Sequence, residues 1–371
     1  MKIVICMMYL SNWSWAIAAD LQSMGHEVHV FDVIGRPISG IASYDTPGIQ
    51  EEYEAFKSKV TAIHLVSSMV HGNLRYILAA PKLMMLARSV GADIVLTLYA
   101  GGYATMAYLS GFRPYAIYAV GSDILMASRY KRLISRIALK PASQVFANGE
   151  YLTVKARDLM PEAKVMALLI GTDLSRIPIA EHRLGVVQII CTREFQNVYN
   201  NDSIINAISR LPRDCPDFQM VFVSAGEMLQ HSISLADSVL TPELRRRVMF
   251  WRGVSFDELL NGLKNSHIFI SMSRSDGTAA SLLEAMGAGL FPILSDIPPN
   301  RPWIDPERQN GVLVPLDDIE ALSNAMLKAI RNASSLGGHA EYNRSLIRRK
   351  ANSAENRRIL EKRLKEIVYE R

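Results

Sequence analysis

Two carboxylates and a glycine turn stand close together in the second half of the sequence. Asp276 and Glu284 are separated by seven residues, and Gly277 directly follows the first acid. The segment 278–288 is rich in Ala, Leu and Met, which predicts a helix that begins near Gly277 and stops at Gly289. The first amides of a helix lack internal partners and can bind a phosphate, while carboxylates can accept hydrogen bonds from sugar hydroxyls. The sequence therefore predicts a pocket for a sugar attached to a phosphate.

The same spacing has a simpler interpretation, in which the acid and the glycine cap a helix and Glu284 lies on a solvated face. The neighbours of Glu284 argue against it, because they are apolar: Leu282, Leu283, Ala285 and Met286. We therefore expect the Glu284 carboxylate to be partly buried and to have a partner.

A cation is expected near the same pocket. Arg193 follows the apolar run 186–191, which predicts a buried strand. Side chains at the carboxyl ends of parallel strands face the ligand crevice of the sheet. A guanidinium there can bind a diphosphate through two hydrogen bonds and stabilise charge on a leaving nucleotide. A surface salt bridge is the alternative interpretation of Arg193.

The elements that position these residues alternate between strand and helix along the chain. Strands are expected near 2–9, 26–34, 93–98, 115–120, 144–147, 164–170, 186–191, 219–224, 248–251 and 267–272. Such alternation is typical of a parallel, doubly wound α/β sheet. The polar stretch 171–185 interrupts it and is expected to be a linker between two domains. The tail 352–371 is predicted to be a charged helix with one apolar stripe.

These motifs resemble those of retaining GT-B glycosyltransferases of family 4, the glycosyl transferases group 1. The family's acid-x7-acid motif matches Asp276 and Glu284, although the family usually has a glutamate first. The segments 250–260, 289–300 and 310–322 follow the family's order around that motif. The resemblance implies two Rossmann-like domains that face each other across a cleft. The acceptor domain would be 1–175, with 352–371 packing back on it, and the nucleotide-sugar donor domain would be 176–351.

The resemblance also implies roles for individual residues, with Arg193, Asp276 and Glu284 in the chemistry. The residues expected to bind the donor are Arg193, Tyr199, Gly226, Arg252, Arg274, Asp276, Gly277, Thr278, Ala279 and Glu284. Those expected on the acceptor side are Trp13, Gly101, Gly102 and Asp123. Each acceptor-side residue has an ordinary alternative: helix-start packing for Trp13, a turn for the glycines and a helix cap for Asp123. The implied reaction moves a sugar from a nucleotide diphosphate sugar to an alcohol with retention, without a metal or cofactor.

Two positions depart from the family's pattern. Tyr199 and Asn200 stand where the family has a lysine, and Val120 stands where it has a histidine. Arg193 could act with the helix N-terminus, Arg274 could compensate, or donor handling could differ. A catalytically degenerate binding or scaffold subunit is therefore an alternative function. A sugar-nucleotide epimerase shares the architecture, but no His or Glu is placed for its acid–base chemistry near the sugar.

Composition narrows the setting of the protein. The chain has 371 residues, 49% of them hydrophobic, and only three scattered cysteines, which favours two globular domains in a reducing cytoplasm. No run is long and apolar enough for a membrane span, and the N-terminus lacks a signal-peptide layout. The net charge of +5 suits anionic ligands, and no nucleic-acid motif is present.

Membrane contact at the inner face is a further expectation from this charge. Segment 128–140 interleaves basic and apolar residues, as interfacial helices do, although a core-facing helix is the alternative. Segment 76–86 is a weaker candidate that we assign to the core. We expect a saccharide or lipid-linked acceptor, as in polysaccharide or glycolipid biosynthesis.

Overall fold

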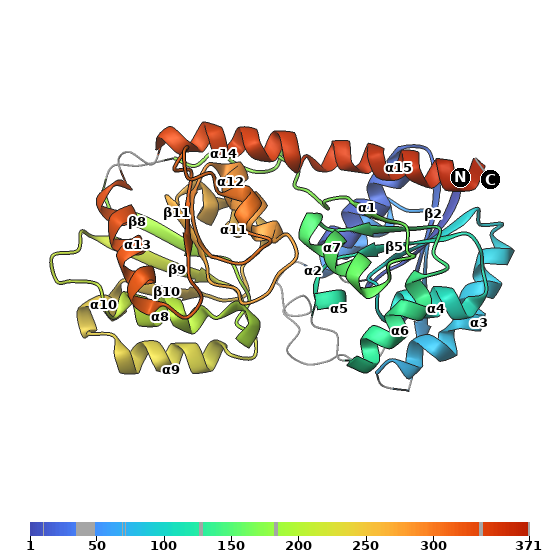
Figure 1. Ribbon diagram of the computed structural model, residues 1–371, viewed down its shortest axis with the longest axis horizontal. Coiled ribbons are helices and arrows are strands. Elements are labelled where there is room, and N and C mark those ends of the chain that lie inside the picture. Colours follow the sequence, from blue (N-terminus) through green and yellow to red (C-terminus); the bar gives the residue numbers. More distant parts are fainter. Residues whose placement is uncertain are drawn as a thin grey trace. The chain divides into compact units, whose positions relative to one another are not determined.

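The chain forms two compact units, each built on one parallel sheet with helices on both faces (Figure 1). The computed structural model describes residues 1–9, 11–34, 49–68, 70, 72–125, 129–181, 185–333 and 337–369. The first unit holds the described residues up to Ile170 together with those from Ser353 onward, and the second unit runs from Gly171 to Asn352. The division falls at the start of the linker expected at 171–185. Both sheets confirm the predicted doubly wound α/β class.

The first unit contains a seven-stranded sheet in the order β3-β2-β1-β4-β5-β6-β7. Its strands are β1 (Lys2–Cys6), β2 (Glu27–Ile34), β3 (Ala62–Ser67), β4 (Ile94–Leu98), β5 (Tyr115–Ala119), β6 (Gln144–Ala147) and β7 (Val165–Ala167). All pairs are parallel, and β4 and β5 are buried along their whole length. Continuous apolar strands are expected where helices cover both faces of a sheet. The strand order reverses beside β1, where ligand crevices form in such sheets.

Eight helices of the described residues surround this sheet: α1 (Asn12–Ser23), α2 (Ile49–Lys57), α3 (Leu74–Ser89), α4 (Gly102–Ser110), α5 (Ser122–Leu125), α6 (Arg129–Leu139), α7 (Glu150–Leu159) and α15 (Ser353–Tyr369). The C-terminal helix α15 packs on α1 and belongs to the first unit. The buried Arg357 of α15 lies with its Nε 3.4 Å from Asp20 Oδ2 and donates from Nη1 to the Ile170 carbonyl at 3.1 Å. Among the described residues, no helix combines the length and apolar content that a membrane span requires.

The second unit contains a six-stranded parallel sheet in the order β10-β9-β8-β11-β12-β13. Its strands are β8 (Val187–Cys191), β9 (Phe218–Val223), β10 (Val248–Trp251), β11 (Ile268–Ser271), β12 (Phe291–Ser295) and β13 (Val312–Val314). Its helices are α8 (Asn201–Ile208), α9 (Leu229–Val239), α10 (Pro242–Arg246), α11 (Phe256–Lys264), α12 (Ala280–Ala288), α13 (Ile319–Arg331) and α14 (Gly337–Lys350). The order reverses between β8 and β11. The loops after these two strands carry Arg193 and Asp276, so the topology brings both to one edge of the sheet.

Helix α12 begins later than its composition predicts. Its first helical residue is Ala280, and Ala279 before it is extended, with φ −70° and ψ 122°. The predicted start near Gly277 is therefore wrong by three residues, because the chain bends at 277–278 and Ala279 is extended before the helix begins. The predicted stop is right, since Gly289 adopts a left-handed φ of 93°.

A close backbone approach fixes the loop that carries Arg193. Phe195 donates its amide to the Ala225 carbonyl at 2.9 Å and accepts at its own carbonyl from Met228 at 2.8 Å. Between these bonds lies Gly226, with φ of +145°, where an added Cβ would lie 2.5 Å from the Phe195 oxygen. Only glycine fits this crossing of the loops after β8 and β9.

Replacement of Gly226 by Ala should destabilise the second unit by about 1–3 kcal/mol, because strain and backbone overlap combine. Gly185→Ala is a matched control, since Gly185 has a φ of +133° with nothing within 4 Å of its added Cβ. Urea unfolding gives the free energy of unfolding of both variants. The loss in Gly185→Ala reports the backbone strain alone, and the additional loss in Gly226→Ala reports the overlap with Phe195. Equal losses in the two variants would show that the loop crossing can relax.

Candidate functional site

A cation, an acid and a hydroxyl meet at the carboxyl edge of the second sheet. The Arg193 Nη2 lies 2.6 Å from Asp276 Oδ2, and its Nη1 donates to Ser281 Oγ at 2.9 Å. The guanidinium also lies over the Tyr199 ring, 4.1 Å from the centroid. Its side chain is only 10% exposed, so these contacts hold it in one place. Sequence reasoning found Arg193, Asp276 and Tyr199 but missed Ser281, because a serine inside a small-residue helix carries no distinctive signal.

The backbone around Arg193 is fixed as firmly as its side chain. The side-chain nitrogen Nδ2 of Asn201 donates to the backbone carbonyl oxygens of Arg193 and Glu194, at 3.3 and 3.1 Å. Asn201 is the first residue of α8 and is buried. The loop after β8 is therefore tied to the start of the next helix, which leaves Arg193 pre-positioned for a ligand.

The start of α12 offers backbone donors beside this cluster. Ala279 supplies no side-chain cap, and its carbonyl accepts from Leu282 and Leu283. Among the described residues, neither Ala280 nor Ser281 gives its N–H to a backbone carbonyl. Such a helix start attracts an anion through its amides and its partial positive charge. The predicted donor residues 277–279 form the chain that leads into this start.

Glu284 lies on α12 and is partly exposed. Burial raises the pKa of its carboxyl group to about 7, and the positive charges of Arg193 and Arg176 oppose that rise. Among the described residues, its carboxylate has no hydrogen-bond partner, so the expected partner within the protein is missing. A partly desolvated acid without a partner is available to a ligand. Arg176, which lies in the linker, was missed because its effect on Glu284 depends on the folded second unit.

Two further arginines of the predicted donor set have other surroundings. Arg274 binds both carboxylate oxygens of Asp317, at 2.7 and 2.6 Å, and donates to Asn200 Oδ1 at 3.1 Å. Hydrogen bonding to Asp317 raises the pKa of Arg274. Arg274 is thus paired within the unit, and its compensation for the absent lysine stays a prediction. Arg252 is exposed after β10 and has no ion pair among the described residues.

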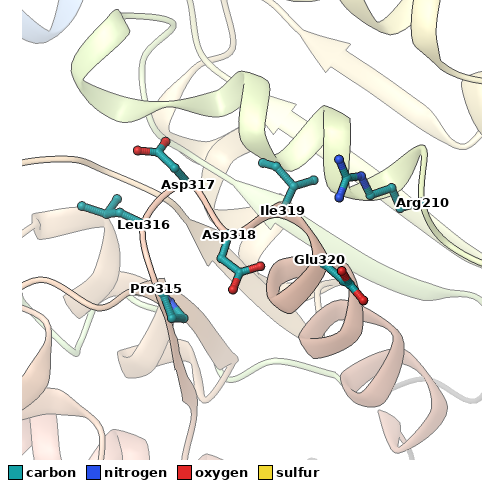
Figure 2. Close-up of a pocket in the computed structure, with 7 residues that line it drawn as sticks. All are labelled: Arg210, Pro315, Leu316, Asp317, Asp318, Ile319 and Glu320. Atoms are coloured by element: carbon teal, nitrogen blue, oxygen red, sulfur yellow. The ribbon is translucent and has the colours of Figure 1, made fainter.

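A surface hollow at the start of α13 lies next to the Arg274–Asp317 pair (Figure 2). It is lined by Arg210 and residues 315–320. Asp318 caps α13 by accepting from the Ala321 amide at 2.9 Å, and Asp317 holds Arg274. With Glu320 the lining has three acids and one arginine, so this hollow repels a diphosphate. The Arg193 cluster suits an anionic ligand better than this hollow does.

In the first unit, Asp123 joins two loops at the carboxyl edge of the sheet. Its Oδ2 accepts from the Ala100 amide at 2.6 Å, and its Oδ1 accepts from the Gly121 amide at 2.8 Å. Burial raises the pKa of Asp123, while these hydrogen bonds lower it. The carboxylate therefore positions the turn at Gly101. This is a wider role than the alternative interpretation, in which Asp123 only caps the helix that follows it.

Aromatic rings line the same edge of the first unit. Trp13 meets Tyr99 edge to face at 5.4 Å, and Tyr99 stacks on Tyr103 at 6.2 Å between centroids. Tyr99 has a φ of +102°, which is rare for a residue with a side chain. An added Cβ at Gly102 would overlap the Tyr76 ring, so this glycine serves close packing. Sequence reasoning missed the three tyrosines, although Tyr99 and Tyr103 flank the glycine pair that it selected.

Glu284→Gln should make the protein more stable at high pH. The native pKa near 7 exceeds the ordinary value of 4.5, so ionisation costs the native state nothing below pH 4.5 and its full amount above pH 7. Glutamine imitates the protonated form. The gain should be on the order of 1–3 kcal/mol at pH 8 and should vanish near pH 4.5.

Unfolding by urea at several pH values measures this gain. The exposed Glu307→Gln, in the same unit, is the matched control and should show no such pH dependence. A gain that is independent of pH would contradict a raised pKa at Glu284.

Two family models match the chain in order. The model described as Glycosyl transferase 4-like matches residues 7–149, and the model described as Glycosyl transferases group 1 matches residues 179–351. The first match covers most of the first unit, and the second covers nearly all of the second unit.

Curated relatives match a shorter stretch. GDP-mannose:cellobiosyl-diphosphopolyprenol alpha-mannosyltransferase of Xanthomonas oryzae pv. oryzae (strain PXO99A) is 32% identical over 114 residues, which are 31% of this chain and 29% of that protein. The protein of the same name from Xanthomonas campestris is 30% identical over 116 residues, 31% of this chain and 30% of its own length. The chain thus matches about three tenths of the length of these relatives.

Solved structures match the whole chain at low identity. Sucrose-phosphate synthase from Thermosynechococcus elongatus has a TM-score of 0.82 at 14% identity and covers 99% of both chains. HepE from Anabaena, in complex with UDP-glucose, has a TM-score of 0.79 at 13% identity and covers 99% of this chain and 100% of its own. A glycosyltransferase from Rickettsia africae has a TM-score of 0.76 at 16% identity, over 100% of this chain and 99% of its own. These likenesses show the GT-B fold. With this fold and two family models matched in order, the chain is a GT-B glycosyltransferase that resembles the glycosyl transferases group 1.

Proposed function

We propose that this protein is a retaining glycosyltransferase that moves a sugar from a nucleotide diphosphate sugar to an alcohol acceptor. The observation that carries the proposal is the Arg193–Asp276–Ser281 cluster beside the uncapped start of α12. The two matched family models support the same reaction class. The donor itself is the co-substrate, and no further cofactor is part of the proposal.

The second unit would hold the diphosphate. As the bond from the anomeric carbon to the phosphate oxygen breaks, negative charge grows on the leaving nucleotide. Arg193 and the amides at the start of α12 would offset that charge. The Nε of Arg193 is buried and has no hydrogen-bond partner among the described residues, so the protein does not saturate this guanidinium. Tyr199 supports its plane from one side.

The two carboxylates would bind hydroxyl groups. Asp276 would orient the donor sugar, because it lies beside the cation that holds the phosphate. Glu284 would hold the two ribose hydroxyls from its place further along α12. An ionised carboxylate accepts both O–H groups better than its protonated form does, so donor affinity should rise as pH increases through about 7.

The acceptor side would lie in the first unit, at the edge that carries Trp13, Gly101, Gly102 and Asp123. We propose a saccharide or lipid-linked acceptor in polysaccharide or glycolipid biosynthesis. The names of the curated relatives support this, since they state a diphosphopolyprenol-linked acceptor. Those names also state GDP-mannose, whereas HepE was solved with UDP-glucose, so both nucleotides are tested as donors.

A panel of UDP- and GDP-sugars tests the function directly. One donor should raise the unfolding midpoint, because binding stabilises the native state by mass action, and should slowly release its nucleoside diphosphate. The same donor should lose most of its shift with Glu284→Gln. Binding without release, even with acceptor extracts, would support the scaffold alternative instead.

Arg193→Ala should lower turnover about 100- to 1000-fold while changing donor affinity less than about tenfold, because the cation acts on charge that develops during bond cleavage. Arg331→Ala is the control: Arg331 pairs with Asp214 on the surface of the same unit. Steady-state kinetics and donor titration separate the two effects. Unchanged turnover in Arg193→Ala would place the charge stabilisation elsewhere.

A further inference from the structure

Helix α3 is apolar on both of its faces. Its inner face is formed by small and medium side chains, Ala79, Ala80, Leu83 and Ala87. Its outer face carries larger ones, with exposed fractions of 51% for Leu74, 42% for Ile77, 56% for Leu78 and 70% for Met85. A surface helix of a globular protein normally presents polar residues on that side. The outer stripe therefore has no partner within the described part of the unit.

The stripe continues over the neighbouring helices. Figure 1 shows α3, α4 and α6 on one side of the seven-stranded sheet, and α4 packs against both of the others. Leu109 of α4 is 46% exposed and Ile137 of α6 is 48% exposed. We call these two residues and the four exposed residues of α3 the α3 face. The α3 face holds half of the exposed large apolar side chains among the described residues, although the three helices make up only a small part of the chain.

The same helices carry charge of one sign. Their sequences contain seven basic residues, Arg75, Lys82, Arg88, Arg129, Lys131, Arg132 and Arg136, and no Asp or Glu. This local charge exceeds the net +5 of the entire chain. Among the described residues, Lys82, Arg88, Arg132 and Arg136 form no ion pair and all four are exposed. The α3 face is thus an apolar surface within a positive field.

We propose that the α3 face docks onto an anionic lipid surface. Aliphatic side chains would enter the headgroup boundary, while the stems of Lys82 and Arg88 lie along it and their charges meet lipid phosphates. A second copy of the chain fits poorly, because face-to-face pairing would bring the two sets of cations together. A protein partner is the less favoured occupant, because cations of one sign spread over two helices suit an extended anionic surface.

The proposal changes the expectation from sequence. We assigned 76–86 to the core, which is wrong for Ile77, Leu78 and Met85, because small alanines fill the inner face. Part of the segment 128–140 lies outside the described residues, so Ile137 is the only residue of its apolar stripe that the α3 face includes. It is also independent of the donor chemistry, which belongs to the second unit.

Flotation with vesicles tests the proposal. The protein should bind phosphatidylcholine vesicles that contain about one third phosphatidylglycerol at least about tenfold more tightly than phosphatidylcholine alone, and high salt should weaken the binding. The double variant Leu78→Glu with Met85→Glu should lose about tenfold or more of this affinity, since it places two acids in the contact. Absence of binding by the unaltered protein would overturn the proposal.

Matched controls keep the result specific. Val154→Glu and Val186→Glu add the same charge at apolar residues that are 50% exposed outside the α3 face, and both should retain binding. Equal losses in the controls would show a general charge effect and would overturn the docking face. A concentration-dependent dimer that only the double variant abolishes, without vesicle binding, would assign the face to self-association instead. Nucleotide release by the double variant without vesicles should be unchanged, so failure here is distinguishable from failure of the proposed function.

Discussion

The ion pair between Arg193 and Asp276 is the interaction on which the second unit's site depends. It joins the loops after β8 and β11, the two strands beside which the strand order of the sheet reverses. Removing one partner of a largely buried pair leaves an uncompensated charge, so both loops must hold their places together. The hydrogen bonds of Asn201 and the close approach at Gly226 also fix the backbone of the loop after β8, which carries Arg193. The site is therefore organised before any ligand arrives.

This pair also links the two halves of the proposed donor. The Asp276 carboxylate and a diphosphate would compete for the same guanidinium. As the phosphate takes part of the Arg193 charge, Asp276 would gain free lone pairs, and the sugar hydroxyls are the nearest donors to satisfy them. Phosphate binding and sugar orientation would thus be coupled through one side chain. The free Nε of Arg193 lets that exchange occur without breaking every protein contact at once.

Strand–helix alternation and the continuous apolar strands were sufficient to predict the fold class, because parallel strands covered on both faces leave a strong pattern. The edge strand β3 was not assigned, since it is half exposed and lacks that pattern. The start of α12 was misplaced because the Ala-, Leu- and Met-rich composition of 278–288 favours helix, whereas Ala279 is extended in the fold. The Arg274–Asp317 pair could not be foreseen, because its partners are far apart in the sequence and meet only in the folded sheet. The same limit applies to Ser281 and to the tyrosines around Gly102.

The two units treat positive charge in opposite ways, and this difference suits different anions. In the second unit, Arg193 is largely buried and paired with Asp276 at 2.6 Å, so a ligand must match a fixed geometry to displace or share that partner. In the first unit, the exposed cations Lys82, Arg88, Arg132 and Arg136 lie on two helices, α3 and α6, and form no ion pairs among the described residues. Such cations attract an extended anionic surface without selecting one molecule. A paired, largely buried cation therefore favours recognition of a single diphosphate, whereas unpaired cations around an apolar stripe favour attachment to a surface.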